Sequence, residues 1–205
     1  IVKAVEKYSD LIIAQPASAQ LLSRPYMRFN IPIELDKLSN NIPGRIIPLI
    51  LHAPTHLGYK GTSHILQAVQ ELKDEGLKFE FKLIENLSHS EMYKLLADAD
   101  IVIDQIFSQT VATLALESMA SGCLVLARYL PERVRISNDC PVVNVNIFTI
   151  KEKLRKAILD REWRIQLASQ GRNFVQKNHD YRLVSEQILN WLQPGGIMEY
   201  DFTPT

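Results

Sequence analysis

Short apolar runs and amphipathic segments alternate along the chain from about residue 45 to residue 193. Five runs are rich in Val, Ile, Leu or Phe, as buried strands are: 46–53, 79–84, 101–106, 124–130 and 140–146. Helical segments fall between and after them: 62–75, Ser88 or Ser90 to Ala99, 110–121, 149–159, 161–178 and 181–193. Strands and helices that alternate in this way pair in parallel through right-handed crossovers. The sequence therefore predicts an α/β fold with a doubly wound open parallel sheet.

The first 44 residues are less regular. Residues 1–9 have the spacing of the end of an amphipathic helix, and residues 11–14 predict a short buried strand. Residues 15–44 hold four prolines and no sustained period, so we interpret them as a linker and crossover, with weak helical turns near 17–22. Residues 194–205 are expected to form a loose tail. The chain starts in mid-pattern, which suggests a piece of a longer protein or a partial record.

Composition argues against several classes of protein. The chain is 46% apolar and 22% charged, as soluble globular proteins are. Its 23 Lys and Arg balance 23 Asp and Glu, whereas nucleic-acid binders usually carry a basic excess. We expect no transmembrane segment and no signal peptide. Cys123 and Cys140 are too few for a disulfide framework and lack metal spacing, so we expect reduced thiols and a cytoplasmic location.

Open parallel sheets bind ligands at the carboxyl ends of their strands. The segments predicted to lie there are 55–61, 85–90, 105–113 and 128–133. In the first segment Gly58 and Gly61 allow close backbone approach, and Lys60 places a cation near a helix N-terminus, where a phosphate is favoured. The loop has neither P-loop nor GxGxxG spacing, so an ordinary turn with a solvated lysine explains it at least as well.

Glu117 is the only charged residue among the 23 between Asp104 and Arg128. The helix predicted around it is rich in small residues, which let a helix lie close to a sheet. Glu117 lies about two turns into that helix, too far from its start to act as an N-cap. Its carboxylate can accept two hydrogen bonds from a vicinal diol such as a ribose. A partly exposed helix glutamate is the alternative, and spacing alone does not separate the two.

Other chemical motifs are weak. Asp98-Ala99-Asp100 has the form of a metal-binding DxD, but it ends a helix and enters a strand, whereas metal-bearing copies usually follow a strand. We therefore predict no metal site and no cofactor. His52 and His56 could hydrogen-bond a substrate, although a structural role is favoured, and no histidine has HExxH spacing. No Ser/His/Asp or Cys/His catalytic set can be assembled.

Four blocks of sequence, in this order and spacing, resemble the group 1 glycosyltransferases. The blocks are HAPTHLGYKGT at 52–62, LADADIVIDQI at 96–106, ALESMASGCLVLA at 115–127 and GRNFVQKNHDYRLVSEQIL at 171–189. Members of this family are retaining nucleotide-sugar enzymes with the GT-B fold. The resemblance implies that 45–193 is the Rossmann-like donor-binding domain, the C-terminal half of a GT-B fold. Residues 1–44 would then be a remnant of the acceptor-binding N-terminal domain with the interdomain linker, followed by the tail at 194–205.

The resemblance also assigns roles to residues. Lys60 matches the lysine that contacts the donor diphosphate, and Thr55 stands where a second cation is usual. Glu117 matches the second of two family glutamates eight residues apart, the one that binds the ribose; Gln109 stands in place of the first, which contacts the transferred sugar. The implied donor-binding residues are Lys60, Gly61, Glu85, Gln109, Thr110, Val111, Ala112, Thr113 and Glu117, with Lys60 and Gln109 catalytic.

The implied reaction is metal-independent, retaining transfer of a hexosyl group from a nucleotide-diphosphate sugar to a hydroxyl of a carbohydrate or lipid-linked acceptor. Lys60 and the dipole of helix 110–122 would stabilise the leaving diphosphate. The enzyme would be cytoplasmic, at most peripheral to the inner membrane, and this piece alone inactive. Thr55 and Gln109 favour an alternative, a non-catalytic nucleotide- or partner-binding domain. A nucleotide-sugar epimerase is a weaker alternative, because Gln109 is not an acid or base.

Overall fold

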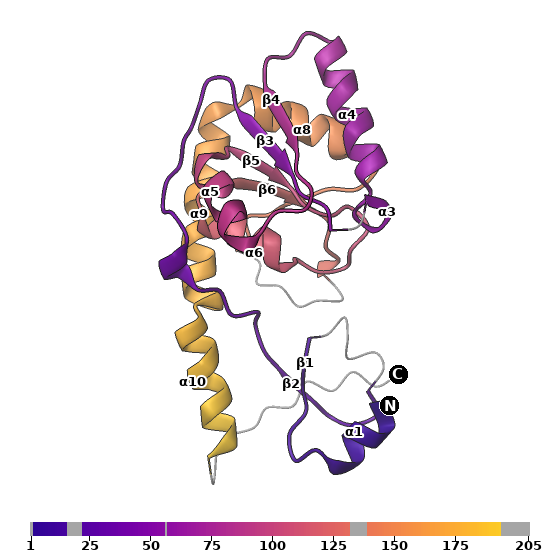
Figure 1. Cartoon of the computed structure of the whole chain (residues 1–205), viewed down its shortest axis with the longest axis vertical. Helices are drawn as coiled ribbons and strands as arrows, with labels where there is room; N and C mark the ends of the chain where they lie inside the picture. Colours follow the sequence, from indigo (N-terminus) through magenta and orange to yellow (C-terminus); the bar gives the residue numbers. More distant parts are fainter. Residues whose placement is uncertain (1, 16–21, 56, 132–138, 194–205) are drawn as a thin grey trace.

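The main sheet has five parallel strands. The computed structural model describes residues 2–15, 22–55, 57–131 and 139–193. The strands are β3 (Leu49–His52), β4 (Glu80–Leu83), β5 (Ile101–Ile103), β6 (Leu124–Ala127) and β7 (Val143–Asn144). They pair in the order β4-β3-β5-β6-β7, so β5 is central, with β3 and β6 on its two sides (Figure 1). All five predicted strands are present, each shorter than its apolar run, and the doubly wound parallel fold is confirmed.

Helices cover both faces of this sheet, and strand residues alternate between them. Ile50, Ile103 and Leu126 pack with α4 (Thr62–Asp74) and α8 (Ile150–Leu159) on one face. Leu51, Val102 and Val125 face the other side. The helices there are α5 (His89–Asp98), α6 (Thr113–Ala120) and α9 (Arg161–His179) (Figure 1). Burial on both faces explains why these strands read as continuous apolar runs.

The start of α5 agrees with the sequence, and the start of α6 does not. Ser88 caps α5 in a reciprocal capping box with Glu91. Helix α6 begins at Thr113, three residues later than predicted. The difference has a local cause, because the amide of Thr110 donates to Ser108 Oγ (3.1 Å) and Ala112 is extended. A side-chain hydrogen bond thus replaces the first helical turn.

The N-terminal residues form a second, smaller unit. Helix α1 (Val2–Tyr8) precedes a two-stranded parallel sheet of β1 (Ile13–Ala14) and β2 (Met27–Arg28), which lies below the main sheet in Figure 1. The buried Glu6 carboxylate accepts hydrogen bonds from the amides of Ser23 (2.6 Å) and Arg24 (3.0 Å), and so fixes the chain before β2.

Part of the predicted linker is therefore regular structure. Both β2 and the 3-10 helix η1 (Leu35–Lys37) fall within residues 15–44, and the one-turn helix α3 (Leu57–Lys60) was also not predicted. These elements are too short for a periodic pattern to reveal them. The turns predicted near 17–22, except Leu22, and the predicted tail lie outside the described residues. Within the described part of the chain, no helix combines the length and the apolar character that a membrane crossing needs.

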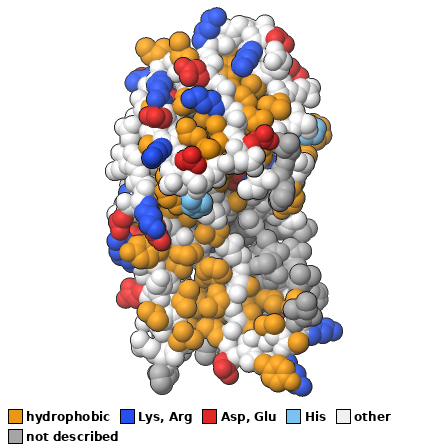
Figure 2. Space-filling model, in the orientation of Figure 1, with side chains coloured by type: hydrophobic (Ala, Val, Ile, Leu, Met, Phe, Trp, Pro, Cys, Tyr) orange, Lys and Arg blue, Asp and Glu red, His pale blue; other side chains and the backbone are white. Residues whose placement is uncertain are grey.

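The junction of α9 and α10 is bound to the segment that joins the two units. Ile33 N donates to His179 O (2.7 Å) and Tyr181 N donates to Ile33 O (3.1 Å), where α9 gives way to α10 (Tyr181–Leu192). From there α10 runs down beside the N-terminal unit (Figure 1). Hydrophobic side chains gather over this lower part of the molecule (Figure 2). Exposed members on α1 and α10 are Val2, Val5, Tyr8, Leu183, Leu189 and Leu192.

Candidate functional site

Backbone hydrogen bonds join the loops that follow β3, β5 and β6. Ile106 N donates to Lys60 O (3.2 Å), and Leu130 N donates to Gln109 O (3.0 Å). We call the surface formed by these three loops and the starts of α4 and α6 the carboxyl edge. The fold therefore brings Lys60 and Gln109, which the sequence places 49 positions apart (109 − 60), to one edge of the sheet.

Lys60, the last residue of α3, is buried and paired. Its Nζ lies 2.7 Å from Oδ1 of Asp104, the first residue after β5, and both side chains are buried. The alternative of a solvated lysine is therefore wrong. The other carboxylate oxygen, Asp104 Oδ2, is buried and has no hydrogen-bond partner in the described part of the chain. Asp104 was missed as a site residue, although an acid directly after a buried parallel strand is itself a signal.

His52, at the end of β3, lies behind this pair. Its Nδ1 contacts Ile103 O (2.8 Å) and its Nε2 contacts Thr62 Oγ1 (2.9 Å). A carbonyl only accepts, so Nδ1 carries the proton and Nε2 accepts from the threonine hydroxyl. Burial lowers the pKa of His52, which agrees with this neutral form. Both nitrogens serve the fold, as the structural interpretation of His52 predicts; His56 lies outside the described residues.

Two helices at the carboxyl edge begin without a side-chain cap. Gly61 precedes α4 and Ala112 precedes α6, and neither supplies an acceptor for the first amides. Gly61 has φ 73°, and a Cβ there would lie 2.4 Å from Ile106 Cγ1, so only glycine fits. Helix α8 also begins without a side-chain cap, at Thr149, whereas α5, α9 and α10 carry caps from Ser88, Asp160 and Asp180. The uncapped amides of α4 and α6 favour an anion.

The segment before α6 offers one unused acceptor. Gln109 is half-buried, and its Oε1 is buried without a hydrogen-bond partner among the residues that the structure describes. The amide of Thr110 is already used by Ser108, while Val111 is buried and Thr113 is exposed. A buried carbonyl without a donor is unfavourable, and a ligand hydroxyl would satisfy it.

Glu117, on α6, is buried, with 6% of its surface exposed. Tyr93 Oη, from α5, donates to Glu117 Oε1 (3.0 Å). His89 lies 3.1 Å from the tyrosine hydroxyl and 3.9 Å from the same carboxylate oxygen. Burial raises the pKa of Glu117, while the Tyr93 hydrogen bond and the His89 charge act to lower it. The alternative of a partly exposed helix glutamate is wrong, and Tyr93 is a site residue that the sequence did not reveal.

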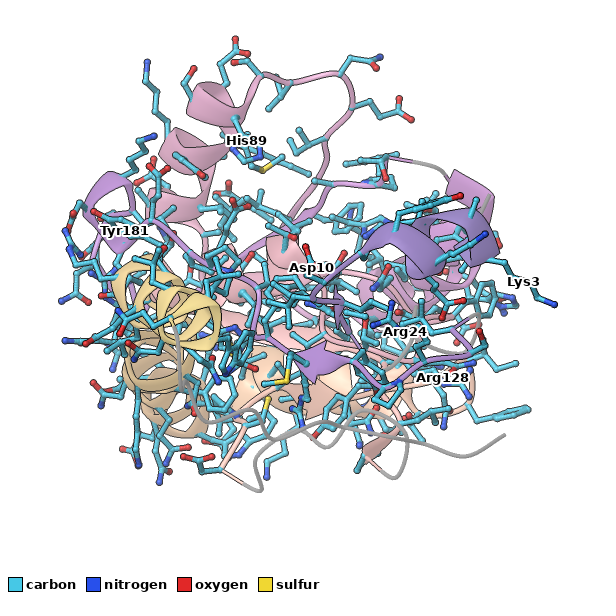
Figure 3. All side chains as sticks on the ribbon, turned by 90° about the horizontal axis from the view of Figure 1, so that it is seen from below. Lys3, Asp10, Arg24, His89, Arg128 and Tyr181 are labelled. Atoms are coloured by element: carbon cyan, nitrogen blue, oxygen red, sulfur yellow. The ribbon has the colours of Figure 1, made fainter. Side chains whose placement is uncertain are left out.

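Figure 3 views the molecule from below and labels His89, the first residue of α5, and Arg128, the first after β6, on opposite sides of the view. Glu85, predicted near the nucleobase, follows β4 and is exposed. The described residues contain no group of three or more His, Cys, Asp or Glu that could hold a metal ion.

The DxD motif lies at the opposite end of β5 and is structural. The Asp100 carboxylate accepts from the amides of Arg45 (2.8 Å) and Leu49 (2.9 Å) and from Arg45 Nη1 (3.1 Å). Its oxygens are thus occupied by the fold, and Asp98 is an exposed residue at the end of α5. The interpretation of this motif as a helix–strand junction is correct.

Comparison with known proteins gives a family and a fold. The model of the glycosyl transferase-like family matches residues 51–190. No curated protein sequence matches the chain. Among solved structures, sucrose-phosphate synthase from Thermosynechococcus elongatus is similar (14% identity, TM-score 0.71), over 93% of this chain and 59% of that one. HepE of Anabaena, solved with UDP and glucose, is also similar (13% identity, TM-score 0.72), over 93% of this chain and 65% of that one.

A third similar structure is a single domain. It is the C-terminal domain of the glycosyl transferase group 1 family protein LpcC from Francisella tularensis (19% identity, TM-score 0.53), matched over 72% of this chain and 98% of that one. At these identities the likeness is one of fold. The chain spans less than two thirds of the first two proteins and nearly all of the third.

Proposed function

This chain belongs to the glycosyl transferase-like family of group 1 GT-B enzymes, and we propose that its carboxyl edge binds a nucleotide-diphosphate sugar. The observation that carries the proposal is the buried Glu117 carboxylate. Burying a carboxylate is unfavourable unless hydrogen-bond donors surround it, and Tyr93 supplies one donor to one oxygen. The hydroxyls of a ribose would supply the missing donors.

The diphosphate would bind between the uncapped starts of α4 and α6, beside Lys60. The Lys60 ammonium has three N–H donors and directs one to Asp104, so it can also donate to a phosphate oxygen. As the bond to the anomeric carbon breaks, negative charge grows on the diphosphate. The ammonium and the helix amides are fixed before the reaction and stabilise that charge. We propose that transfer proceeds with retention and without a metal.

Gln109 would contact the transferred hexosyl group. Its unpaired Oε1 can accept a hydrogen bond from a sugar hydroxyl, as a carboxylate would, but without a charge. The amides of Val111, Ala112 and Thr113 would face the sugar and the phosphates, and Glu85 would lie near the base. These roles make Lys60 and Gln109 the catalytic residues of the proposal.

The acceptor would approach from the smaller unit. We propose that residues 45–193 form the donor half and that residues 1–44 belong to the acceptor half, which has its own sheet. The exposed apolar residues of α1 and α10 support an incomplete acceptor half in this chain. The acceptor would be a hydroxyl of a carbohydrate or of a lipid-linked sugar, at a cytoplasmic site that can lie beside a membrane. This chain alone would bind donor without transferring it.

Calorimetry with UDP, GDP and ADP tests the proposal. We expect one of the three to bind, and both Lys60→Ala and Glu117→Ala to weaken binding by about 10-fold or more, since each removes a charge-assisted contact. Glu186→Ala, an exposed acid on α10, serves as the matched control. Circular dichroism shows whether each variant is folded. Equal affinities of the wild type and both site variants would rule out this binding site.

A non-catalytic nucleotide-binding domain remains the second candidate. Thr55 and Gln109 favour it, because each replaces a charged residue of the family pattern with a neutral one. Both candidates predict nucleotide binding, so the discriminating measurement is turnover. A full-length protein that binds a radiolabelled UDP-sugar and transfers none of it to any acceptor would favour the second candidate.

A further inference from the structure

Tyr93 and Glu117 meet across two neighbouring helices that the fold holds in fixed positions. The Tyr93 ring packs against the two hydrophobic clusters on the α5, α6 and α9 face of the sheet. Its hydroxyl reaches Glu117 Oε1 at 3.0 Å. Because the ring is held by packing, the hydroxyl is a fixed donor, and the carboxylate that accepts from it cannot rotate freely.

We infer that Tyr93 is a positioning residue: it fixes one oxygen of Glu117 and leaves the other to select a ribose. Oε2 of Glu117 accepts no hydrogen bond from any residue that the structure describes. A carboxylate offers about four lone-pair sites, so one tethered oxygen still leaves room for two ligand hydroxyls. This inference rests on the proposed nucleotide-sugar function, and it adds a source for the discrimination between ribose and deoxyribose.

The direction of the hydrogen bonds follows from the protonation of Tyr93. Burial, and next the Glu117 charge, raise the pKa of Tyr93 to about 12, so the hydroxyl keeps its proton at neutral pH. That single proton goes to Glu117, which as a carboxylate only accepts. His89 Nδ1, at 3.1 Å, must then donate to Tyr93 Oη. The three residues form one directed chain that ends on the carboxylate.

This series of hydrogen bonds sets the pH range over which Glu117 is charged. Tyr93 and His89 face Glu117 from α5, and Glu34, which is paired with Lys37, faces Tyr93 from the N-terminal segment. Burial raises the pKa of Glu117 and the Tyr93 hydrogen bond opposes that rise. Removing the hydroxyl therefore raises the pKa of Glu117 further. A ribose needs the carboxylate form of Glu117. As the pH falls, a variant without the Tyr93 hydroxyl should therefore lose ribose binding at a higher pH than the wild type does.

Tyr93→Phe tests the inference, since it removes one oxygen and keeps the packed ring. We would measure the affinity of the 205-residue chain for UDP, GDP and ADP, and for the 2′-deoxy form of each. The wild type should prefer the ribose form of the nucleotide it binds. In Tyr93→Phe the affinity for that form should fall about 3- to 10-fold, with little change for the deoxy form. Tyr8→Phe, at a tyrosine that is 80% exposed, is the matched control.

A second measurement needs no ligand. Carbon-13 NMR of labelled glutamate carboxyls should show Glu117 titrating at higher pH in Tyr93→Phe than in the wild type, with Glu117→Gln identifying its signal. An unchanged titration, or an unchanged ratio of ribose to deoxyribose affinity, would overturn the role of Tyr93. A wild type that binds none of the nucleotides would overturn the proposed function, and the ribose role with it. That outcome differs from a failure of the Tyr93 role alone, in which the wild type still binds a nucleotide.

Discussion

Asp100 and Asp104 lie at the two ends of β5, and both are buried, but their surroundings differ. At the amino end, Asp100 accepts from two backbone amides and an arginine, and Arg164 Nε lies 4.0 Å away. At the carboxyl end, Asp104 is bound to Lys60 through one oxygen, and its other oxygen has no partner in the described residues.

The difference extends to the neighbours of each aspartate. At the carboxyl edge Gln109 Oε1 has no partner, and Glu117 has one. Buried polar groups are usually satisfied, and an exception marks either strain or a missing ligand. Asp100 therefore uses its acceptors to hold the fold, whereas Asp104 and Gln109 each keep one acceptor free. Among the described residues near the amino end, Ser121 Oγ and Arg164 Nε are also buried without a hydrogen-bond partner. The two ends should respond to substitution in different observables, stability at one and binding at the other.

The largest effect is expected at the amino end. Asp100→Ala leaves the amides of Arg45 and Leu49 without acceptors and removes the nearest anion from the buried Arg164. The free energy of unfolding should fall by about 3–5 kcal/mol, as when one partner of a buried pair is removed. Urea denaturation measures this change.

Asp98→Ala is the control, because Asp98 lies two residues away on the same junction and is exposed. It should change stability by no more than about 0.5 kcal/mol, as surface charges do. If Asp98→Ala and Asp100→Ala lowered the free energy of unfolding equally, Asp100 would not be the structural acid of this motif.

Asp104→Asn, compared with Asp100→Asn, should show how the two ends of the sheet differ in stability and in nucleotide affinity. The substitution keeps the shape of the side chain but removes the anion that neutralises Lys60. Stability should fall by about 1–3 kcal/mol, while the affinity for the nucleoside diphosphate should rise about 3- to 10-fold, because the phosphates no longer compete with a carboxylate. Urea denaturation and calorimetry give the two values.

Asp100→Asn is the matched variant at the other end of the same strand. It should lower stability and leave the nucleotide affinity unchanged. Weaker binding by Asp104→Asn would instead assign Asp104 the task of orienting Lys60, and it would reverse the expected sign.

Glu117→Gln should stabilise the protein and weaken ligand binding. Burial raises the pKa of Glu117 above its ordinary value, so the folded state holds a proton that the unfolded state has released. Stability therefore decreases as pH rises from the unfolded pKa through the folded one, and the penalty is fully present above the folded pKa. At pH 7 Glu117→Gln should be more stable than the wild type by about 0.5–2 kcal/mol, as when a functional site is relaxed.

The gain should vanish at acid pH, where the wild-type carboxyl is also protonated. Thermal unfolding between pH 4 and pH 8, with Glu186→Gln as an exposed control, follows the trend. A difference that is constant across this range would mean that burial of the charge is not its cause.

Much of the fold was predictable because its signals are local and periodic. The five strands were visible as apolar runs, and the Ser88 cap was visible as a residue type before a helix. Local sequence also singled out Lys60, by its place after a strand, and Glu117, as a lone charge, but it left their roles open; the resemblance to the family assigned the roles, which stay predictions. In each case the information lies within a few residues of the feature.

The remaining features depend on contacts between distant residues. Asp104 and Lys60 are 44 positions apart, and Tyr93 and Glu117 are 24 apart. No period or motif specifies which side chain a loop will place against another. Strand β2 was missed for a related reason, because a two-residue strand that pairs with the distant β1 leaves no pattern in a proline-rich segment.

The smallest effect is expected at Gln109, the unpaired acceptor of the carboxyl edge. Gln109→Met replaces the buried carbonyl with an apolar group of similar length, so stability should be unchanged or rise by up to about 0.5 kcal/mol. If the carbonyl contacts the transferred sugar, UDP should bind as before, while UDP-glucose should bind about 3- to 10-fold more weakly, since its hydroxyl would lose an acceptor. Calorimetry with both ligands gives the ratio of the UDP-glucose affinity to the UDP affinity. Any general effect of the substitution on the site cancels in this ratio. A clear loss of stability would show that Gln109 serves the fold, and the two ends of the sheet would then differ less than their hydrogen bonds indicate.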